Sequence, residues 1–148
     1  MSKLEFRDTH VSDIESLFEV RARTRQNPLS RQELSQLGIT PQSTAAALNS
    51  GDTISVVCVD HRRVVGFCTG DVQTGEILVL AVLPAYEGRG IGKRLLNQVV
   101  ERVLSGGASR VWLAAAADPL VRAHGFYRAL GWRPTGDKAA NGDEILEL

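Results

Sequence analysis

One stretch of the sequence predicts a strand, a glycine loop and a helix in direct succession. Residues 77–83 read ILVLAVL, an almost unbroken apolar run of the length expected for a strand that is covered on both faces. Pro84 ends that strand, because proline has no N–H group to donate to a sheet. Gly88, Gly90 and Gly92 follow at alternate positions. The next apolar residues recur at helical spacing, which predicts a helix that begins on the loop (Ile91, Leu95, Leu96, Val99, Val100 and Val103).

The junction of this loop with the helix predicts an anion-binding site. The first turn of a helix has backbone N–H groups without partners and carries the positive end of the helix dipole. Glycines have no Cβ, so a phosphate can approach those N–H groups closely. Two other phosphate-binding motifs fit poorly. A P-loop needs Ser or Thr where Arg94 follows Lys93, and a dinucleotide fingerprint would have G-x-G-x-x-G spacing after the first strand of a βαβ unit.

The same residues resemble the central motif of the GNAT superfamily of N-acetyltransferases. Residues 80–92, LAVLPAYEGRGIG, are similar to the family pattern L-A-V-x-P-x-Y-[RQ]-G-x-G-I-G, whose loop binds the pyrophosphate of acetyl-CoA. One position departs from the pattern, because Glu87 stands where the family usually has Arg or Gln. The resemblance implies acetyl-CoA as co-substrate, bound by Leu80, Ala81, Val82, Glu87, Gly88, Arg89, Gly90, Ile91, Gly92 and Lys93.

Length and composition suit one domain over residues 1–148. A chain of this length buries close to ~70% of its unfolded surface, and its 43% hydrophobic and 23% charged residues are ordinary for a globular protein. The 17 basic residues equal the 17 acidic ones, so no net field attracts nucleic acid or a membrane surface. No apolar stretch approaches the ~20 residues of a membrane span, and the N-terminus lacks an apolar signal core. We expect a cytoplasmic protein.

Turn signals and periodicity predict the remaining elements. Helix start and stop signals predict helices over residues 12–25, 30–38, 40–51 and 118–131, capped by Ser12, Ser30, Thr40 and Asp118. Alternating or β-branched runs predict strands over residues 3–7, 53–59, 63–72, 111–115, 132–133 and 144–148.

This order of elements matches the GNAT-type acyl-CoA N-acyltransferase fold. The expected class is α/β (α+β), with a mixed sheet of about six or seven strands flanked by helices and splayed between its fourth and fifth strands. In that fold the splay leaves backbone groups near Leu80 to Val82 free to bind the pantetheine arm. The resemblance also implies that residues 27–50 line the acceptor pocket. The exposed edge after Glu144 could pair across a homodimer axis.

Two residues are candidates for proton transfer. An amine with a pKa near ~10 is mostly protonated at neutral pH, so its attack on a thioester needs a base. Glu76 matches a strand-start glutamate that acts in some family members as general base through water. Tyr127, within AHGFYRALGW at 123–132, matches the family's A-x-x-[FL]-Y-x-x-x-G-[FW], whose tyrosine can protonate the leaving thiolate. The alternatives are a solvated carboxylate at a turn and a core tyrosine.

The cysteines, the histidines and the basic residues of the first predicted helix also bear on the chemistry. Cys58 and Cys68 lie in strand-like runs, and we expect buried thiols that do not face each other. With scattered histidines and separated cysteines, no metal site is predicted. Basic residues end the first predicted helix, where the helix dipole favours cations. The functional alternative is that Arg21 or Arg25 binds a carboxylate of the acceptor.

The resemblance implies an acetyl-CoA-dependent N-acetyltransferase that acts on a primary amine of a small molecule by direct attack. Two other functions stay open. A non-catalytic acyl-CoA-binding module that senses or regulates would need neither Glu76 nor Tyr127. A protein acetyltransferase, for an N-terminus or a lysine, would favour an open acidic groove, whereas residues 27–50 are helical enough to close a pocket.

Overall fold

A computed structural model describes residues 3–25 and 28–148 as an α/β fold with two sheets. The first sheet is antiparallel, in the order β1-β2-β3-β4, and contains β1 (Leu4–Asp8), β2 (Thr53–Asp60), β3 (Arg63–Asp71) and β4 (Ile77–Val82). The second sheet has the order β5-β7-β6 and contains β5 (Trp112–Ala115), β6 (Arg133–Lys138) and β7 (Glu144–Glu147). The expected mixed α/β class is confirmed.

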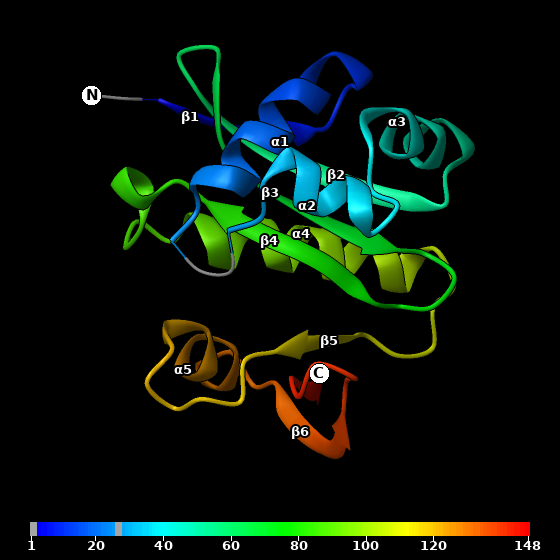
Figure 1. The fold of residues 1–148 in the computed structure, drawn as a ribbon, viewed down its shortest axis with the longest axis vertical. Coiled ribbons are helices and arrows are strands. Elements are labelled where there is room, and N and C mark those ends of the chain that lie inside the picture. The colour runs from blue at the N-terminus through cyan, green and yellow to red at the C-terminus, as the bar shows by residue number, and fades with distance from the viewer. Residues whose placement is uncertain (1–2, 26–27) are drawn as a thin grey trace.

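The helices cover both faces of the first sheet. They are α1 (Ile14–Arg23), α2 (Arg31–Gln36), α3 (Pro41–Ser50), α4 (Ile91–Ser105) and α5 (Arg122–Ala129), with two short 3-10 helices, η1 (Val11–Asp13) and η2 (Pro84–Tyr86). Figure 1 shows α1, α2 and α3 in front of this sheet and α4 behind it, while α5 lies with the second sheet. Within the described residues, no helix combines the length and apolar character needed to cross a membrane.

β4 and β5 pair only where the two strands start. A single parallel bridge joins Glu76 to Trp112, and the N–H of Trp112 donates to the carbonyl of Gly75 at 3.1 Å. Beyond this bridge the strands diverge into separate sheets (Figure 1). The predicted splay between the fourth and fifth strands is therefore confirmed.

The divergence leaves one edge of β4 without a neighbouring strand. The N–H of Leu83 donates to the carbonyl of Val65 on β3 at 2.8 Å. In an antiparallel pair, the backbone N–H and C=O groups of every second residue point to the same neighbouring strand, so Ala81 also bonds to β3. The backbone N–H and C=O groups of Leu80 and Val82 consequently point away from β3, toward the side on which β5 diverges.

α4 packs closely on the face of the first sheet that lies opposite to α1, α2 and α3. It packs through the apolar positions that the helical spacing of the sequence predicted. All six are buried: Ile91, Leu95, Leu96, Val99, Val100 and Val103. Gly70 of β3 makes this approach possible, because a Cβ at that position would lie 2.8 Å from the methyl carbons of both Val99 and Val103. Because α4 starts at the glycine loop, this packing also fixes where the loop sits.

The predicted central strand is not covered on both faces along its whole length. The register between β3 and β4 shifts where Thr69 pairs with Val79 but Gly70 pairs with Ile77. Leu78 is left out of the pairing and is 44% exposed. A β-bulge of this kind redirects side chains locally, and one side of β4 is open as a result.

Three helix starts in the N-terminal half were predicted from capping signals, and one is wrong. Ser30 and Thr40 cap α2 and α3 as predicted, each accepting a backbone N–H three residues further on at 3.1 Å. Ser12 does not cap α1. The 3-10 helix η1 precedes α1, and the carboxylate of Asp13 accepts the backbone N–H of His10 at 2.7 Å.

Two predictions for the C-terminal part are also corrected. Asp118 does not start a helix, because its carboxylate accepts the N–H of Leu120 at 2.9 Å in a turn, and α5 begins only at Arg122. The strand that begins at Glu144 has no exposed edge, since β7 lies between β5 and β6. The edge expected to support a homodimer is thus already paired.

The two cysteines lie on neighbouring strands of the hairpin that β2 and β3 form. Cys58 is opposite Gly66, and Cys68 is opposite Val56, so the thiols do not face each other, as expected. Both are fully buried. Burial raises the pKa of Cys58 to about 11, and it also raises the pKa of Cys68. Both thiols are therefore neutral at physiological pH.

Replacing Gly70 by alanine tests the packing of α4. The new methyl group would overlap Val99 and Val103, and we expect a loss of about 1–3 kcal/mol in the free energy of unfolding. Gly125→Ala in α5 is the control, because a Cβ there meets nothing within 4 Å and should stabilise the helix by roughly 0.5–1 kcal/mol. Urea unfolding measures both changes, and equal midpoints for the two variants would contradict the packing argument.

Candidate active site

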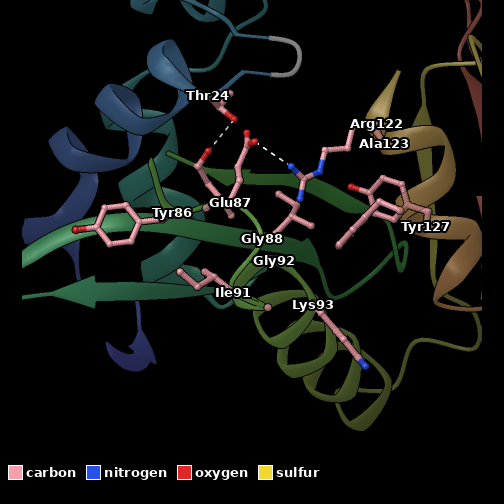
Figure 2. Close-up of a pocket in the computed structure, with 14 residues that line it drawn as sticks. Thr24, Tyr86, Glu87, Gly88, Ile91, Gly92, Lys93, Arg122, Ala123 and Tyr127 are labelled. Atoms are coloured by element: carbon pink, nitrogen blue, oxygen red, sulfur yellow. Dashed lines mark hydrogen bonds and ion pairs between the residues drawn. The ribbon is translucent and has the colours of Figure 1, made fainter. Parts of the chain in front are cut away.

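A cavity of about 150 Å³ opens between the glycine loop and α5. One wall is the free edge of β4, at Leu80 and Val82, and the opposite wall is α5 (Figure 2). Most of the residues predicted to bind the cofactor line it: Leu80, Val82, Glu87, Gly88, Gly90, Ile91, Gly92 and Lys93. The structure thus gathers the predicted loop and strand residues around one space.

Two of the predicted cofactor-binding residues do not line this cavity. Ala81 is buried in the core, and its backbone bonds to β3 instead of facing α5. The guanidinium of Arg89 lies over the ring of Tyr86, 4.9 Å from its centroid. Within the predicted set, the strand contribution therefore rests on Leu80 and Val82.

The glycine loop presents the N-terminus of α4 to the cavity. Gly88 and Gly90 have φ values of +76° and +79°, a left-handed conformation that strains any residue with a Cβ. Gly90 is the N-cap residue of α4, and the first bond of the helix is from the N–H of Arg94 to its carbonyl. The backbone N–H groups of residues 91–93 come before that bond and have no partner in the helix. Their charge and direction suit an anion such as a diphosphate.

The carboxylate of Glu87 is held by two arginines. Nη1 of Arg122, at the start of α5, lies 3.0 Å from it, and Nε of Arg25, beyond the end of α1, lies 3.4 Å away. Figure 2 shows Arg122 reaching across from α5 to Glu87. The negative charge at the position that departs from the family pattern is thus compensated locally. Arg122 also lines the cavity, where it adds positive charge.

Thr24 ties the end of α1 to the free edge of β4. Its side chain is buried, and its hydroxyl donates to the carbonyl of Val82 at 3.2 Å. The N–H of Val82 and the backbone groups of Leu80 point away from β3 and have no side-chain partner among the described residues. Sequence reasoning missed Thr24 and Arg122. An unbalanced acid at Glu87 was the signal that could have pointed to a compensating base.

Tyr127 projects from α5 with its hydroxyl directed into the cavity (Figure 2). Its ring packs edge-on against Phe126 and Trp132, with centroid distances of 5.1 and 6.0 Å, so its orientation is well defined. Burial raises the pKa of Tyr127 well above its usual range, and the positive charge of Arg21 opposes this rise. The hydroxyl is therefore protonated at neutral pH and can act as a donor.

Glu76 lies outside this cavity, at the bridge between β4 and β5. Its side chain is partly buried. Burial raises the pKa of its carboxyl, and the nearby charge of Asp71 raises it further. The raised pKa suits a group that accepts a proton near neutral pH. The structure does not bring Glu76 into the lining that Tyr127 shares with the glycine loop.

A second cavity, of about 340 Å³, lies between the first sheet and the helices α1, α2 and α3. Leu78, left exposed by the bulge in β4, is part of its lining. Helices from the segment 27–50, which the family resemblance associates with the acceptor, also contribute to it. Among the residues that the structure describes, no group of three or more His, Cys, Asp or Glu side chains is placed to hold a metal ion.

Comparison with known proteins decides the family. A family model described as the acetyltransferase (GNAT) family matches residues 14–132, more than half of the chain. The chain belongs to this family. A solved structure of the GNAT fold, the PaiA N-acetyltransferase from Thermoplasma acidophilum in complex with coenzyme A, matches 98% of both chains with a TM-score of 0.79 at 20% identity. This likeness shows a shared fold.

Curated relatives match this GNAT chain over part of their length. An uncharacterized ycf52-like N-acetyltransferase of Prochlorococcus marinus is 40% identical over 83 residues, 53% of this chain and 44% of that protein. The ribosomal protein bS18-alanine N-acetyltransferase of Haemophilus influenzae is 26% identical over 68 residues, 44% of this chain and 47% of that protein. The matched segments thus span less than half of each of these relatives.

The pairing of Glu87 predicts how acetyl-CoA affinity responds to Arg122. Arg122→Ala removes a cation from the cavity and leaves Glu87 less compensated, so the dissociation constant of acetyl-CoA should rise about tenfold. Glu87→Gln removes the negative charge and should leave the affinity unchanged or improve it. Isothermal titration calorimetry measures both, and wild-type affinity in Arg122→Ala would contradict both the role of this cation in the cavity and the need to compensate Glu87.

Proposed function

We propose that this protein is an acetyl-CoA-dependent N-acetyltransferase that acts on the primary amine of a small molecule. The observation that carries the proposal is one cavity lined by the free edge of β4, the N-terminus of α4 and the hydroxyl of Tyr127. These three parts match the three parts of the co-substrate that need recognition: an amide-bearing arm, a diphosphate and a sulfur. The shared fold with a coenzyme A complex supports the same assignment.

Recognition of the co-substrate falls to backbone groups. Leu80 and Val82 offer N–H and C=O groups to an amide-bearing arm, as an added strand would use them. The N–H groups of residues 91–93 receive the diphosphate, with Arg122 beside them. The N–H of Val82, at the same edge, is the candidate donor to the oxyanion that forms when an amine attacks the thioester.

Proton transfer falls to Glu76 and Tyr127. Glu76 takes the proton of the attacking amine through water, since it lies outside the cavity itself. Tyr127, whose hydroxyl carries its proton at neutral pH, is the candidate donor to the departing thiolate. Direct attack is favoured over a covalent acyl-enzyme, because the raised pKa of each cysteine keeps its thiol a poor nucleophile.

Two other functions are less well supported. A non-catalytic acyl-CoA sensor has no need for a tyrosine hydroxyl aimed into the cavity, whereas Tyr127 provides one. A protein acetyltransferase has precedent in the Haemophilus relative, whose name describes action on a ribosomal protein. The cavity beneath α1, α2 and α3 suits a small acceptor better than an extended chain, because helices cover it.

Binding of acetyl-CoA is the first test. At ~100 times its dissociation constant, acetyl-CoA should add about 2.7 kcal/mol to the free energy of unfolding, whereas NAD should add nothing. Gly90→Val should abolish the shift, because a side chain there obstructs the diphosphate. Gly142→Val is the matched control. It has the same left-handed strain, at φ +91°, in the turn between β6 and β7, and it should keep the shift. No shift with wild-type protein would refute the proposal.

The pH dependence of kcat tests the proton-transfer roles. Tyr127→Phe should lower kcat by about 100-fold while the acetyl-CoA shift persists. Glu76 acts as a base only when it is deprotonated, so kcat should fall as the pH drops through the pKa of this carboxyl. Because that pKa is raised, the fall should occur at a higher pH than for an ordinary carboxyl. Glu76→Gln should therefore lose most activity near neutral pH and least near pH ~10, where free amine is abundant. A uniform loss across pH would contradict the role of Glu76.

A further inference from the structure

Arg21 differs from the two arginines that follow it at the end of α1. Arg23 pairs with Glu19 at 3.4 Å, and Arg25 pairs with Glu87 at 3.4 Å. The guanidinium of Arg21 has neither an ion pair nor a hydrogen bond with any residue that the structure describes, although its side chain is partly buried. Burial lowers its pKa, yet an arginine stays charged at neutral pH. A partly buried cation without a partner is suited to an anionic ligand.

Arg21 lines the second cavity, whose walls are otherwise mostly apolar. Phe18 of α1 and Leu34 of α2 lie on the helix side, and Phe67 and Val79 lie on the sheet side. At about 340 Å³ the cavity is within the size range of small-molecule sites. The ligand that fits it has an apolar body and one negative group.

The charges of this cavity exclude a polycationic acceptor. None of the described residues that line it is acidic, so nothing there would receive a second or third ammonium group. The polar lining residues are hydroxyls, and the side chains of Ser55 and Thr69 already bond to each other at 2.9 Å. Arg21 is the charged group of the described lining, and it selects a carboxylate, which its planar fork can bind with two parallel bonds.

The second cavity and the cavity that holds Tyr127 are both bounded by β4. Leu78 and Val79 line the one, and Leu80, the next residue of β4, lines the other. Arg21 is also near enough to Tyr127 for its charge to oppose the rise in the pKa of the tyrosine. For an acceptor with its anion on Arg21, the reaction requires that the amine extend toward the edge of β4 that Leu80 shares with the cavity of Tyr127.

We propose that the acceptor is an apolar amino acid, bound with its carboxylate on Arg21 and its side chain in the second cavity. This inference rests on the proposed acetyltransferase function and adds the substrate class. The amine nitrogen forms a bond to the thioester carbonyl carbon, and the carbon–sulfur bond breaks. The amine proton passes to Glu76 through water, and the thiolate takes the proton of Tyr127. The products are an N-acetyl amino acid and coenzyme A.

L-Leucine and L-leucinamide test the role of Arg21, because they differ only in the carboxylate. The measured quantity is the ratio of kcat/KM for the acid to that for the amide, from the release of thiol. Comparing this ratio between variants cancels the different amine pKa values of the two compounds. In Arg21→Ala the ratio should fall by about 10- to 100-fold, mainly through KM for leucine. Arg21→Lys keeps the positive charge but not the planar fork of the guanidinium, so the ratio should fall less in this variant.

Arg23→Ala is the matched control, since Arg23 lies on the same helix and pairs with Glu19 outside the cavity. It should keep the wild-type ratio. The acetyl-CoA shift in thermal unfolding verifies that each variant is folded. Wild-type protein should also acetylate leucine faster than spermidine, a polycation.

Three results would overturn the inference. An unchanged acid-to-amide ratio in Arg21→Ala means that Arg21 does not bind the carboxylate, and the transferase function survives. Faster acetylation of spermidine, or of a peptide N-terminus, than of any apolar amino acid means that the acceptor class is wrong. An acetyl-CoA shift without turnover of any amine removes the transferase function, and this inference with it.

Discussion

The divergence of β4 from β5 is the constraint on which the rest of this structure depends. Backbone N–H and C=O groups that lose a strand partner need another one, because leaving them buried and unpaired is costly. Thr24 satisfies the carbonyl of Val82, across 58 residues of sequence. The remaining groups of that edge open into a cavity at the head of α4. The glycine loop, α5 and the end of α1 all meet there.

Charge in this protein matters locally, although its overall sum is zero. At the glycine loop the carboxylate of Glu87 lies between Arg25 and Arg122, which compensate its charge, so the loop can still bind an anion. Under α1 the situation is reversed, because Arg21 lines a cavity in which no described acid is present. Arg21 and Arg25 are four residues apart, and only their neighbours from distant segments give them different roles.

The sequence predicted those parts of the fold and site that depend on contiguous residues. The central strand, the glycine loop and α4 form one continuous pattern, and the caps at Ser30 and Thr40 act over three residues. Errors arose where a distant segment decided the outcome. Asp13 binds Arg7 of β1 and the backbone of His10, which leaves no role for Ser12 as a cap. β7 pairs with β5 on one side and β6 on the other. Arg122 bonds to Glu87, which is 35 residues away in the sequence.

The register shift sets Ile77 apart from the rest of β4, which begins to pair again at Val79. A slip of one residue would otherwise turn every side chain of a strand to its other face. Here the offset is confined to Leu78, between the pairs that Thr69 and Gly70 make. Variation in the turn that joins β3 to β4 can be accommodated at that point, so it does not propagate to Leu80 and Val82. Substitutions at Leu78, in the second cavity, can therefore occur without a change in the alignment of Leu80 and Val82.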